Sequence, residues 1–397
     1  MGLGTGGIGD AMQRFGLGYF VVQLALQEKA PELGSLYLGL LGLSQGVPGI
    51  VVGLFGGVLA DRMERRRLLL LSRVGSMVVV LLLAALIITG NATVPPILLL
   101  SLIGAIATSI DFPTRQSLLS SIVPQRDLMS AVGLTQASGN AAMLVGPLVG
   151  GLLIIPLGVA GLMIANAVTS VATIVALVLL RPLPQAIAPR HESVLRSLAD
   201  GIAYVAREPV LRWVIILGGV VGFFARPYIQ LMPAFAAVSL GVGPVELSWL
   251  LAAIGFGTLA GSLISGSFGD RRRTGLSLAG SVLVCGAALV LFAFQRSLGP
   301  AMALLVVTAV CHFIFAGIAF TLMQTRTPDH LRGRAVAIFI TTLQGLGPLG
   351  ILTFGSLGVV VGVDRSLALG GLIAAVAGGA ILLRVRALRD VGAQGPV

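Results

Sequence analysis

Long apolar runs, broken by short arginine-rich turns, constrain this chain more than any other feature. Of its 397 residues, 56% are hydrophobic and only 10% are charged, whereas soluble domains carry about 25% charged residues. A helix needs about 20 apolar residues to cross a bilayer. Because the runs are long and continuous rather than alternating, they predict membrane-spanning helices and exclude a transmembrane β-barrel.

Twelve such segments predict an all-α integral membrane protein with two pseudo-symmetric six-helix bundles. The expected spans are 3–28, 33–60, 68–90, 94–116, 128–156, 158–180, 210–238, 245–269, 274–295, 298–323, 333–361 and 366–388. The chain then divides into a first bundle at 1–180, a cytoplasmic linker at 181–209 and a second bundle at 210–397. Apolar residues from Val194 to Val205 recur at helical spacing, which predicts a short amphipathic helix on the membrane surface within the linker.

The net charge of +11 follows membrane topology rather than a nucleic-acid site. Arginines gather in alternate loops, such as 62–73 and 181–212, while the opposite loops hold only Lys29, Arg296 and Arg365. By the positive-inside rule, the arginine-rich loops and both termini are cytoplasmic. We therefore expect a multi-pass protein of the cytoplasmic (inner) membrane, with the lipid bilayer as a partner and no nucleic acid.

Two features indicate internal duplication. The charged turn within 57–67 has a shorter echo within 266–273, and each turn follows a long apolar run. Small residues four apart mark the middle span of each successive triplet, for example Gly257 and Gly261 in the eighth span, and they let helix backbones approach closely. This placement predicts inverted three-helix repeats in each half. The alternative is that glycine is simply abundant, with 54 residues in the chain.

Three motifs resemble those of the major facilitator superfamily. The turn Gly57-x-Leu59-Ala60-Asp61-Arg62-x-x-Arg65-Arg66 resembles the signature loop between helices 2 and 3, with Glu64 where a glycine is usual. Gly146-Pro147-x-x-Gly150-Gly151 is similar to the motif common in antiporters. Gly9-Asp10, together with Asp111-Phe-Pro113-Thr-Arg115, resembles the drug:proton antiporter branch, which includes enterobactin-exporter-like and macrolide-exporter-like proteins.

The resemblance implies a fold, a function and a set of site residues. It implies a central chamber with alternating access and export of drug-like or amphiphilic small molecules in exchange for protons. The gating residues that it implies are Gly57, Asp61, Arg62, Arg65, Arg66, Arg115, Asp270 and Arg271. The antiporter-motif residues are Gly146, Pro147, Gly150 and Gly151. Arg65 lies one helical turn beyond Asp61, and we expect it to reach Asp111.

Charged residues inside the spans are candidate functional groups, because a mid-bilayer charge costs about 2.5–3.5 kcal/mol on insertion scales. Asp10 is the first candidate for proton coupling, followed by Asp111 and Glu246. Burial favours a neutral carboxyl group and a nearby cation favours a charged one, so a mobile partner can switch it. The alternatives are a static pair between Asp10 and Arg14, a structural role for Asp111 and a solvated helix-start role for Glu246.

The predicted substrate cavity is large, apolar and sparsely charged, which suits amphiphilic substrates better than sugars or phosphates. The candidate lining residues are Gln13, Arg14, Gln136, Asn140, Arg226, Tyr228, Gln230 and Gln344. Arg226 either meets an anionic substrate or pairs with a carboxylate across the cavity. We interpret His312 as a packing residue with satisfied hydrogen bonds.

The sequence contains no motif for nucleotide hydrolysis, metal binding or covalent catalysis. We therefore expect no cofactor, no enzymatic activity, an ion gradient as the energy source, and a monomer. Three alternatives stay open for the function. These are siderophore or lysolipid export, proton-coupled uptake of another solute, and a receptor or scaffold without transport. A membrane-embedded enzyme is the least favoured.

Overall fold

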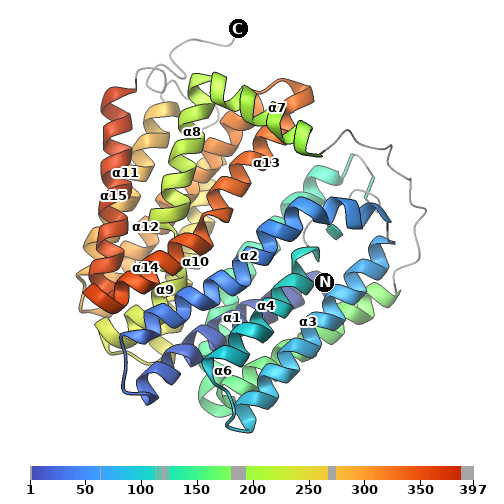
Figure 1. Ribbon diagram of the computed structural model, residues 1–397, viewed down its shortest axis with the longest axis vertical. Coiled ribbons are helices and arrows are strands. Elements are labelled where there is room, and N and C mark those ends of the chain that lie inside the picture. Colours follow the sequence, from blue (N-terminus) through green and yellow to red (C-terminus); the bar gives the residue numbers. More distant parts are fainter. Residues whose placement is uncertain are drawn as a thin grey trace. The chain divides into compact units, whose positions relative to one another are not determined.

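The computed structural model describes residues 2–62, 64–111, 114–115, 118, 123–124, 126–179, 194–266 and 274–385, and this part of the chain is helical without a β-strand (Figure 1). Its elements are α1 (Gly2–Gln27), α2 (Leu33–Arg62), α3 (Arg65–Ile88), α4 (Val94–Ser109), α6 (Leu128–Leu179), α7 (Val194–Arg207), α8 (Pro209–Val220), the π-helix η1 (Val221–Ala225), α9 (Tyr228–Ala234), the π-helix η2 (Phe235–Leu240), α10 (Pro244–Gly266), α11 (Thr274–Ala293), α12 (Leu298–Thr325), α13 (Asp329–Gly345), α14 (Gly347–Val361) and α15 (Val363–Arg384).

The helices account for the predicted membrane spans. Within the described residues, eight continuous helical stretches are long and apolar enough to cross a membrane. One of them, α6, contains the fifth and the sixth predicted spans, and α1, α2 and α4 supply the first, second and fourth. The all-α architecture expected from the apolar runs is therefore confirmed, and described helices cover each of the twelve predicted spans.

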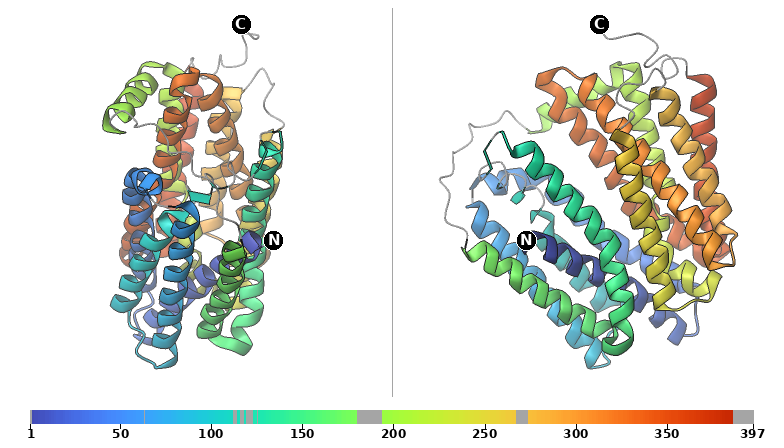
Figure 2. Two further views of the ribbon diagram at one scale, coloured as in Figure 1. Left: turned by 90° about the vertical axis from the view of Figure 1, so that its right-hand side faces the viewer. Right: turned by 180° about the vertical axis from the view of Figure 1, so that it is seen from behind.

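Helix α6 is two spans joined by a sharp reversal at Gly158. This residue has φ 64° and ψ −178°, which is not helical. Only glycine adopts such a backbone without steric cost, because it has no Cβ. The green segment in Figure 2 accordingly runs as two antiparallel arms. The boundary falls where the sequence predicted it, between spans 128–156 and 158–180.

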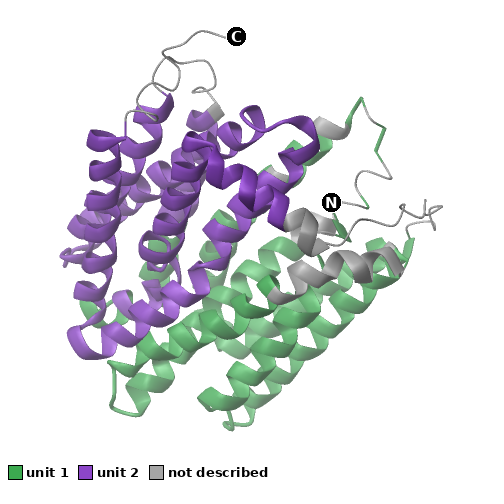
Figure 3. Ribbon diagram, turned by 45° about the horizontal axis from the view of Figure 1, so that its top comes forward, with its two compact units in different colours: residues 1–189, 236–252 green, residues 190–235, 253–397 purple. Residues whose placement is uncertain are grey.

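The chain separates into two compact units (Figure 3). Unit 1 contains residues 1–189 and 236–252, and unit 2 contains residues 190–235 and 253–397. The core of unit 1 is built from apolar side chains of α1, α2, α3, α4 and α6, including Leu17, Leu83, Ile97 and Met163. Between 0 and 1% of each of these four residues is exposed.

Unit 2 has its own core, formed by α8, η1, α11, α12, α13 and α15 together with α7. The predicted linker helix is present as α7, and it packs on this core through the buried Val205. The hydroxyl of Tyr204 in α7 also donates to the carbonyl of Arg326 at 3.0 Å. Asp200 and Arg207, on the opposite face of α7, are exposed, as an amphipathic helix requires.

The seventh span, expected over 210–238, is present as one helical stretch, Pro209–Leu240. Within it, the structure distinguishes α8, η1, α9 and η2. The amide of Arg226 bonds to the carbonyl of Val221, five residues earlier, at 2.9 Å. Pro227 and Pro233 have no amide hydrogen to donate to the helix. Such π-turns insert one extra residue and often occur at functional sites.

Candidate functional site

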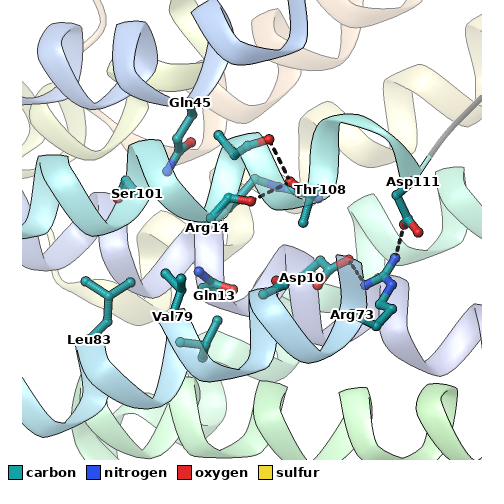
Figure 4. Close-up of a pocket in the computed structure, with 14 residues that line it drawn as sticks. Asp10, Gln13, Arg14, Gln45, Arg73, Val79, Leu83, Ser101, Thr108 and Asp111 are labelled. Atoms are coloured by element: carbon teal, nitrogen blue, oxygen red, sulfur yellow. Dashed lines mark hydrogen bonds and ion pairs between the residues drawn. The ribbon is translucent and has the colours of Figure 1, made fainter. Parts of the chain in front are cut away.

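A polar cavity of about 210 Å³ lies inside unit 1, among α1, α2, α3 and α4. Its lining comprises Asp10, Gln13 and Arg14 of α1, Gln45 of α2, Arg73, Ser76, Val79, Val80 and Leu83 of α3, Ser101, Gly104, Ala105 and Thr108 of α4, and Asp111 just beyond α4. The charged and amide side chains thus share a pocket with an apolar wall. Figure 4 shows how they lie around it.

Arg73 joins the two predicted carboxylates, Asp10 and Asp111, inside this cavity (Figure 4). Its Nη1 donates to Oδ2 of Asp10 at 3.1 Å, and its Nη2 donates to Oδ2 of Asp111. Only 5% of the Arg73 side chain is exposed, compared with 26% for Asp10 and 9% for Asp111. Because an unpaired charge at this depth would be costly, the guanidinium and the two carboxylates stabilise one another.

Arg115 brings a second cation to Asp111. Its Nη2 lies 2.5 Å from Oδ2 of Asp111, one helical turn away. Oδ1 of Asp111 and Nε of Arg115 are both buried without a hydrogen-bond partner. The described partners of Asp111 are therefore Arg73 and Arg115. The predicted contact from Arg65 stays untested, because the side chain of Arg65 lies outside the described residues.

The structure does not contain the alternative pair between Asp10 and Arg14. Asp10 forms its ion pair with Arg73 instead. Arg14 lines the cavity, is exposed, and has no described ion pair or hydrogen bond. Gln13, one position earlier, accepts a 2.5 Å hydrogen bond from Nδ2 of Asn166 in α6. The two neighbouring residues therefore differ, since Gln13 is held by the scaffold and Arg14 is not.

Sequence reasoning counted Arg73 with the arginines of the loop after the second span, although the expected third span, 68–90, also contained it; the loop placement is wrong. Arg73 lies within α3, buried in unit 1. The signal for this placement was present, because Arg73 is separated from the cluster ending at Arg67 by an apolar run and lies among small polar residues at Ser72 and Ser76. A lone cation inside a span is the pattern of a residue that faces the bundle interior.

The remaining proton-coupling candidate lies elsewhere in unit 1. Glu246 is half-buried in the first turn of α10, where a carboxylate is favoured by the helix dipole. It does not line the cavity that contains Asp10 and Asp111. Asn140 is a half-buried residue of α6 and is also absent from that lining. The side chain of Gln136 lies outside the described residues.

The predicted cavity residues of unit 2 gather around the interrupted seventh span. Arg226 and Gln230 are half-buried, Tyr228 is 1% exposed, and Gln344 in α13 is exposed. Within the described part of the chain, Arg226 has no carboxylate partner. His312 is buried and its Nδ1 has no hydrogen-bond partner, so its interpretation as a satisfied packing residue is wrong at that atom.

One gating candidate is held by the end of another helix. Nε of Arg66 donates to the carbonyl of Leu177 at 2.8 Å, and Nη2 donates to that of Val178 at 2.6 Å. These are final carbonyls of α6, which have no partner within the helix. The side chains of Gly57, Asp61, Arg62 and Arg65, together with Asp270 and Arg271, lie outside the described residues.

The antiporter motif forms a close packing surface within unit 1. A Cβ on Gly146 would lie 2.4 Å from Cβ of Ala11, and one on Gly150 would lie 2.8 Å from the ring of Phe15. A Cβ on Gly151 would likewise clash with the side chain of Ser248. Pro147, between these glycines, is buried. The small residues therefore let α6 contact α1, which supplies three cavity residues, at nearly backbone distance.

Comparison with known proteins agrees with this architecture. Residues 6–351 match the Major Facilitator Superfamily. The "Multidrug efflux pump Tap" of Mycolicibacterium fortuitum is 29% identical over 360 residues, covering 86% of this chain and 85% of that protein. The "Enterobactin exporter EntS" of Shigella boydii serotype 4 (strain Sb227) is 29% identical over 363 residues, covering 88% and 84%.

Solved structures show the same fold at lower identity. A bacterial homolog of the human lysosomal transporter Spinster, in an inward-facing and unoccupied conformation, has a TM-score of 0.74 at 16% identity and covers 99% of this chain and 98% of that chain. A D-xylose-proton symporter has a TM-score of 0.73 at 15% identity, with 96% and 95% covered. With a family match over most of its length and two helical units of the expected kind, the chain belongs to the Major Facilitator Superfamily, a family of multi-pass membrane transporters.

Proposed function

We propose that this transporter exports drug-like or amphiphilic small molecules across the cytoplasmic (inner) membrane in exchange for protons, by alternating access. The family match supports a transporter, and two relatives whose names describe exporters support the direction. The positive-inside pattern supports cytoplasmic termini. The protein acts as a monomer, with Asp61 and the arginines of its loop, and Asp270 and Arg271 of the echo, gating the chamber.

The observation that carries the proton coupling is the sharing of Arg73 by Asp10 and Asp111. Two carboxylates that depend on one guanidinium compete for it, so neutralising either strengthens the hold of the other. Asp10 is the more exposed of the two and has only Arg73 as a described cation partner, whereas Asp111 also has Arg115. Asp10 is therefore the group that takes up the proton.

The energy of one such contact is of the right size to move a conformational equilibrium. Two unit charges 4 Å apart interact by about 4 kcal/mol at an effective dielectric constant near 20. Shifting a two-state equilibrium from 1:99 to 99:1 takes about 5.5 kcal/mol. Protonation of Asp10, combined with substrate release, can then reverse the preference between inward-open and outward-open states.

Proteoliposomes with an imposed pH gradient test this proposal. Ethidium and naphthalene-2-sulfonate, which are amphiphiles of opposite charge, serve as flux probes. The parent should move at least one of them against the proton flow, and Asp10→Asn should abolish substrate-linked proton movement while retaining binding. Asp127→Asn, which removes an exposed carboxylate beside Arg126, is the control and should retain coupling. An unchanged ratio of protons to substrate in Asp10→Asn would remove Asp10 from the mechanism.

Siderophore export is the second candidate, because several relatives bear the name "Enterobactin exporter EntS". Competition between enterobactin and the two flux probes separates the candidates. A protein dedicated to siderophores should transport enterobactin and leave ethidium and naphthalene-2-sulfonate behind. A drug exporter should transport one of the probes whether or not enterobactin competes. Movement of substrate into the cytoplasmic compartment would indicate uptake instead.

A further inference from the structure

Arg14 is a cation inside a membrane span that no part of the described scaffold neutralises. It lies in the middle of α1, lines the cavity of unit 1 and is exposed there. It has neither an ion pair nor a hydrogen bond within the described residues. Charged side chains are rare in such positions, and they usually have a carboxylate partner or face a substrate path.

The carboxylates of the cavity are already engaged. Asp10 lies four residues before Arg14, on the same face of α1, yet its Oδ2 accepts from Arg73. Asp111 accepts from Arg73 and from Arg115. Three arginines thus surround two carboxylates, which leaves one positive charge in excess. The excess is carried by the guanidinium with the most accessible surface, that of Arg14.

The rest of the lining suits the polar end of an amphiphilic molecule, because it combines polar side chains with an apolar wall. Ser101 also lines the cavity, and its Oγ is buried without a hydrogen-bond partner among the described residues, so the protein does not satisfy every polar atom of this wall. Val79, Val80 and Leu83 form an apolar wall on α3. At about 210 Å³, the cavity is smaller than the roughly 300–1,000 Å³ of pockets that enclose a drug-sized molecule. It can therefore take one end of an amphiphile, while the remainder stays outside.

We infer that this cavity binds an anionic group of the transported molecule, a carboxylate or sulfonate, through Arg14, with the adjoining apolar carbons against Val79, Val80 and Leu83. Calling the ligand cargo rests on the proposed export function, but the binding itself does not. Arg14 binds the anion by charge-assisted hydrogen bonds, which are about twice as strong as neutral ones and are bidentate for a planar guanidinium. Arg14→Lys would keep the positive charge but would lose the two parallel hydrogen bonds that a planar guanidinium can donate to one anionic group.

A matched pair of ligands isolates the charge. Naphthalene-2-sulfonate and naphthalene-2-sulfonamide have the same ring system and nearly the same shape, and only the sulfonate is anionic at neutral pH. We would titrate each into purified, detergent-solubilised protein by calorimetry. The parent should prefer the sulfonate. Arg14→Gln should weaken sulfonate binding by about tenfold or more, the size expected for one charge-assisted contact, and leave sulfonamide binding nearly unchanged. The sulfonate affinity of Arg14→Lys should lie between that of the parent and that of Arg14→Gln.

One further variant serves as a control. Arg126→Gln removes an exposed arginine outside the cavity and should leave both affinities as in the parent. The inference is overturned if the parent binds the two ligands equally, if it does not bind the sulfonate at millimolar concentration, or if Arg14→Gln keeps the parent's preference for the sulfonate.

Flux measurements separate this inference from the export proposal. If sulfonate binding depends on Arg14 but proteoliposomes move neither naphthalene compound nor ethidium, the anion site stands and export fails. If ethidium or the sulfonamide is exported while the sulfonate neither binds nor moves, export stands and the anion site fails. Proteins that retain their thermal unfolding midpoint are used throughout, so that loss of binding is not a loss of folding.

Discussion

Arg73 and Asp10 are 63 positions apart in the sequence, yet Nη1 of the arginine donates a 3.1 Å hydrogen bond to Oδ2 of the aspartate inside unit 1. The same guanidinium reaches Asp111 with its other terminal nitrogen. Three helical segments are therefore tied at one buried point. A change in the charge of Asp10 therefore acts directly on Arg73 of α3 and, through that one side chain, on Asp111 just beyond α4.

Replacing Arg73 by glutamine should destabilise the protein strongly. The change leaves Asp111 with one cation and Asp10 with none, and removing one partner of a buried ion pair costs about 3–5 kcal/mol. Chemical denaturation in detergent measures the free energy of unfolding. Arg126→Gln removes an arginine whose side chain is 85% exposed, and it should change stability by less than about 1 kcal/mol. Equal losses in the two variants would mean that the buried network contributes little.

Two glycines of α6 should respond to alanine with opposite signs. Gly146→Ala places a Cβ 2.4 Å from that of Ala11, so α1 must shift, at a cost of about 1–3 kcal/mol. Gly139→Ala meets nothing within 4 Å and should stabilise the helix by about 0.5–1 kcal/mol. Thermal unfolding of the two variants beside the parent measures the difference. A stabilising Gly146→Ala would contradict the close packing of α6 on α1.

The reversal inside α6 depends on the backbone of Gly158 and not on space around it. A Cβ there would meet nothing within 4 Å, but the combination of φ 64° and ψ −178° is essentially restricted to glycine and costs other residues about 1–3 kcal/mol. Gly158→Ala should therefore lower stability by about this amount, although the space around the added Cβ is open. Gly158→Val should lower it by at least as much. If Gly158→Ala left the thermal unfolding midpoint unchanged, the backbone explanation would be wrong.

Arg66 should protect the end of α6 from opening. Its two hydrogen bonds to the carbonyls of Leu177 and Val178 are charge-assisted, and their loss should cost about 1–2 kcal/mol locally. Hydrogen exchange of the last turn of α6 should accelerate in Arg66→Gln. Arg67→Gln is the matched control, since the side chain of Arg67 is 77% exposed and its described partner is Glu64. Similar exchange in the two variants would show that Arg66 does not hold this helix end.

The latch predicted at Asp61 has its own test. Asp61→Asn removes the charge expected to stabilise the outward-facing state, so the population should shift inward. Labelling of single cysteines on either side of the membrane reports the balance. Glu64→Gln, in the same turn, controls for a general change of loop charge. Identical labelling of Asp61→Asn and the parent from both sides would count against the latch.

Much of the fold could be predicted because it depends on local properties. Hydropathy over about 20 residues places a span, and the boundary between the fifth and sixth spans was found within two residues of Gly158. The close-packing role of Gly257 and Gly261 was also predicted, and both approach backbone atoms of α12. The π-turns of the seventh span were missed, because one inserted residue hardly alters the apolar pattern.

The sequence predicted only part of the candidate site. Asp10 and Asp111 were identified as rare intramembrane carboxylates, since the cost of burying charge depends only on position along a span. Their shared partner, Arg73, was counted with the loop arginines, and the pair considered as an alternative role for Asp10 was with Arg14. Spacing along one helix indicates which residues can pair, but it does not rank them against a residue on another helix.

The sequence by itself determined the spans, the small-residue packing faces and the presence of charge inside the bundle, because each follows from interactions between near neighbours and the surrounding solvent. The tertiary structure decided that Arg73 holds both carboxylates, that Arg66 binds the end of α6 and that Arg14 has no described partner. These outcomes depend on how each helix is rotated and how closely its neighbours pack. That rotation is set by the simultaneous packing of many side chains, so no single segment encodes it.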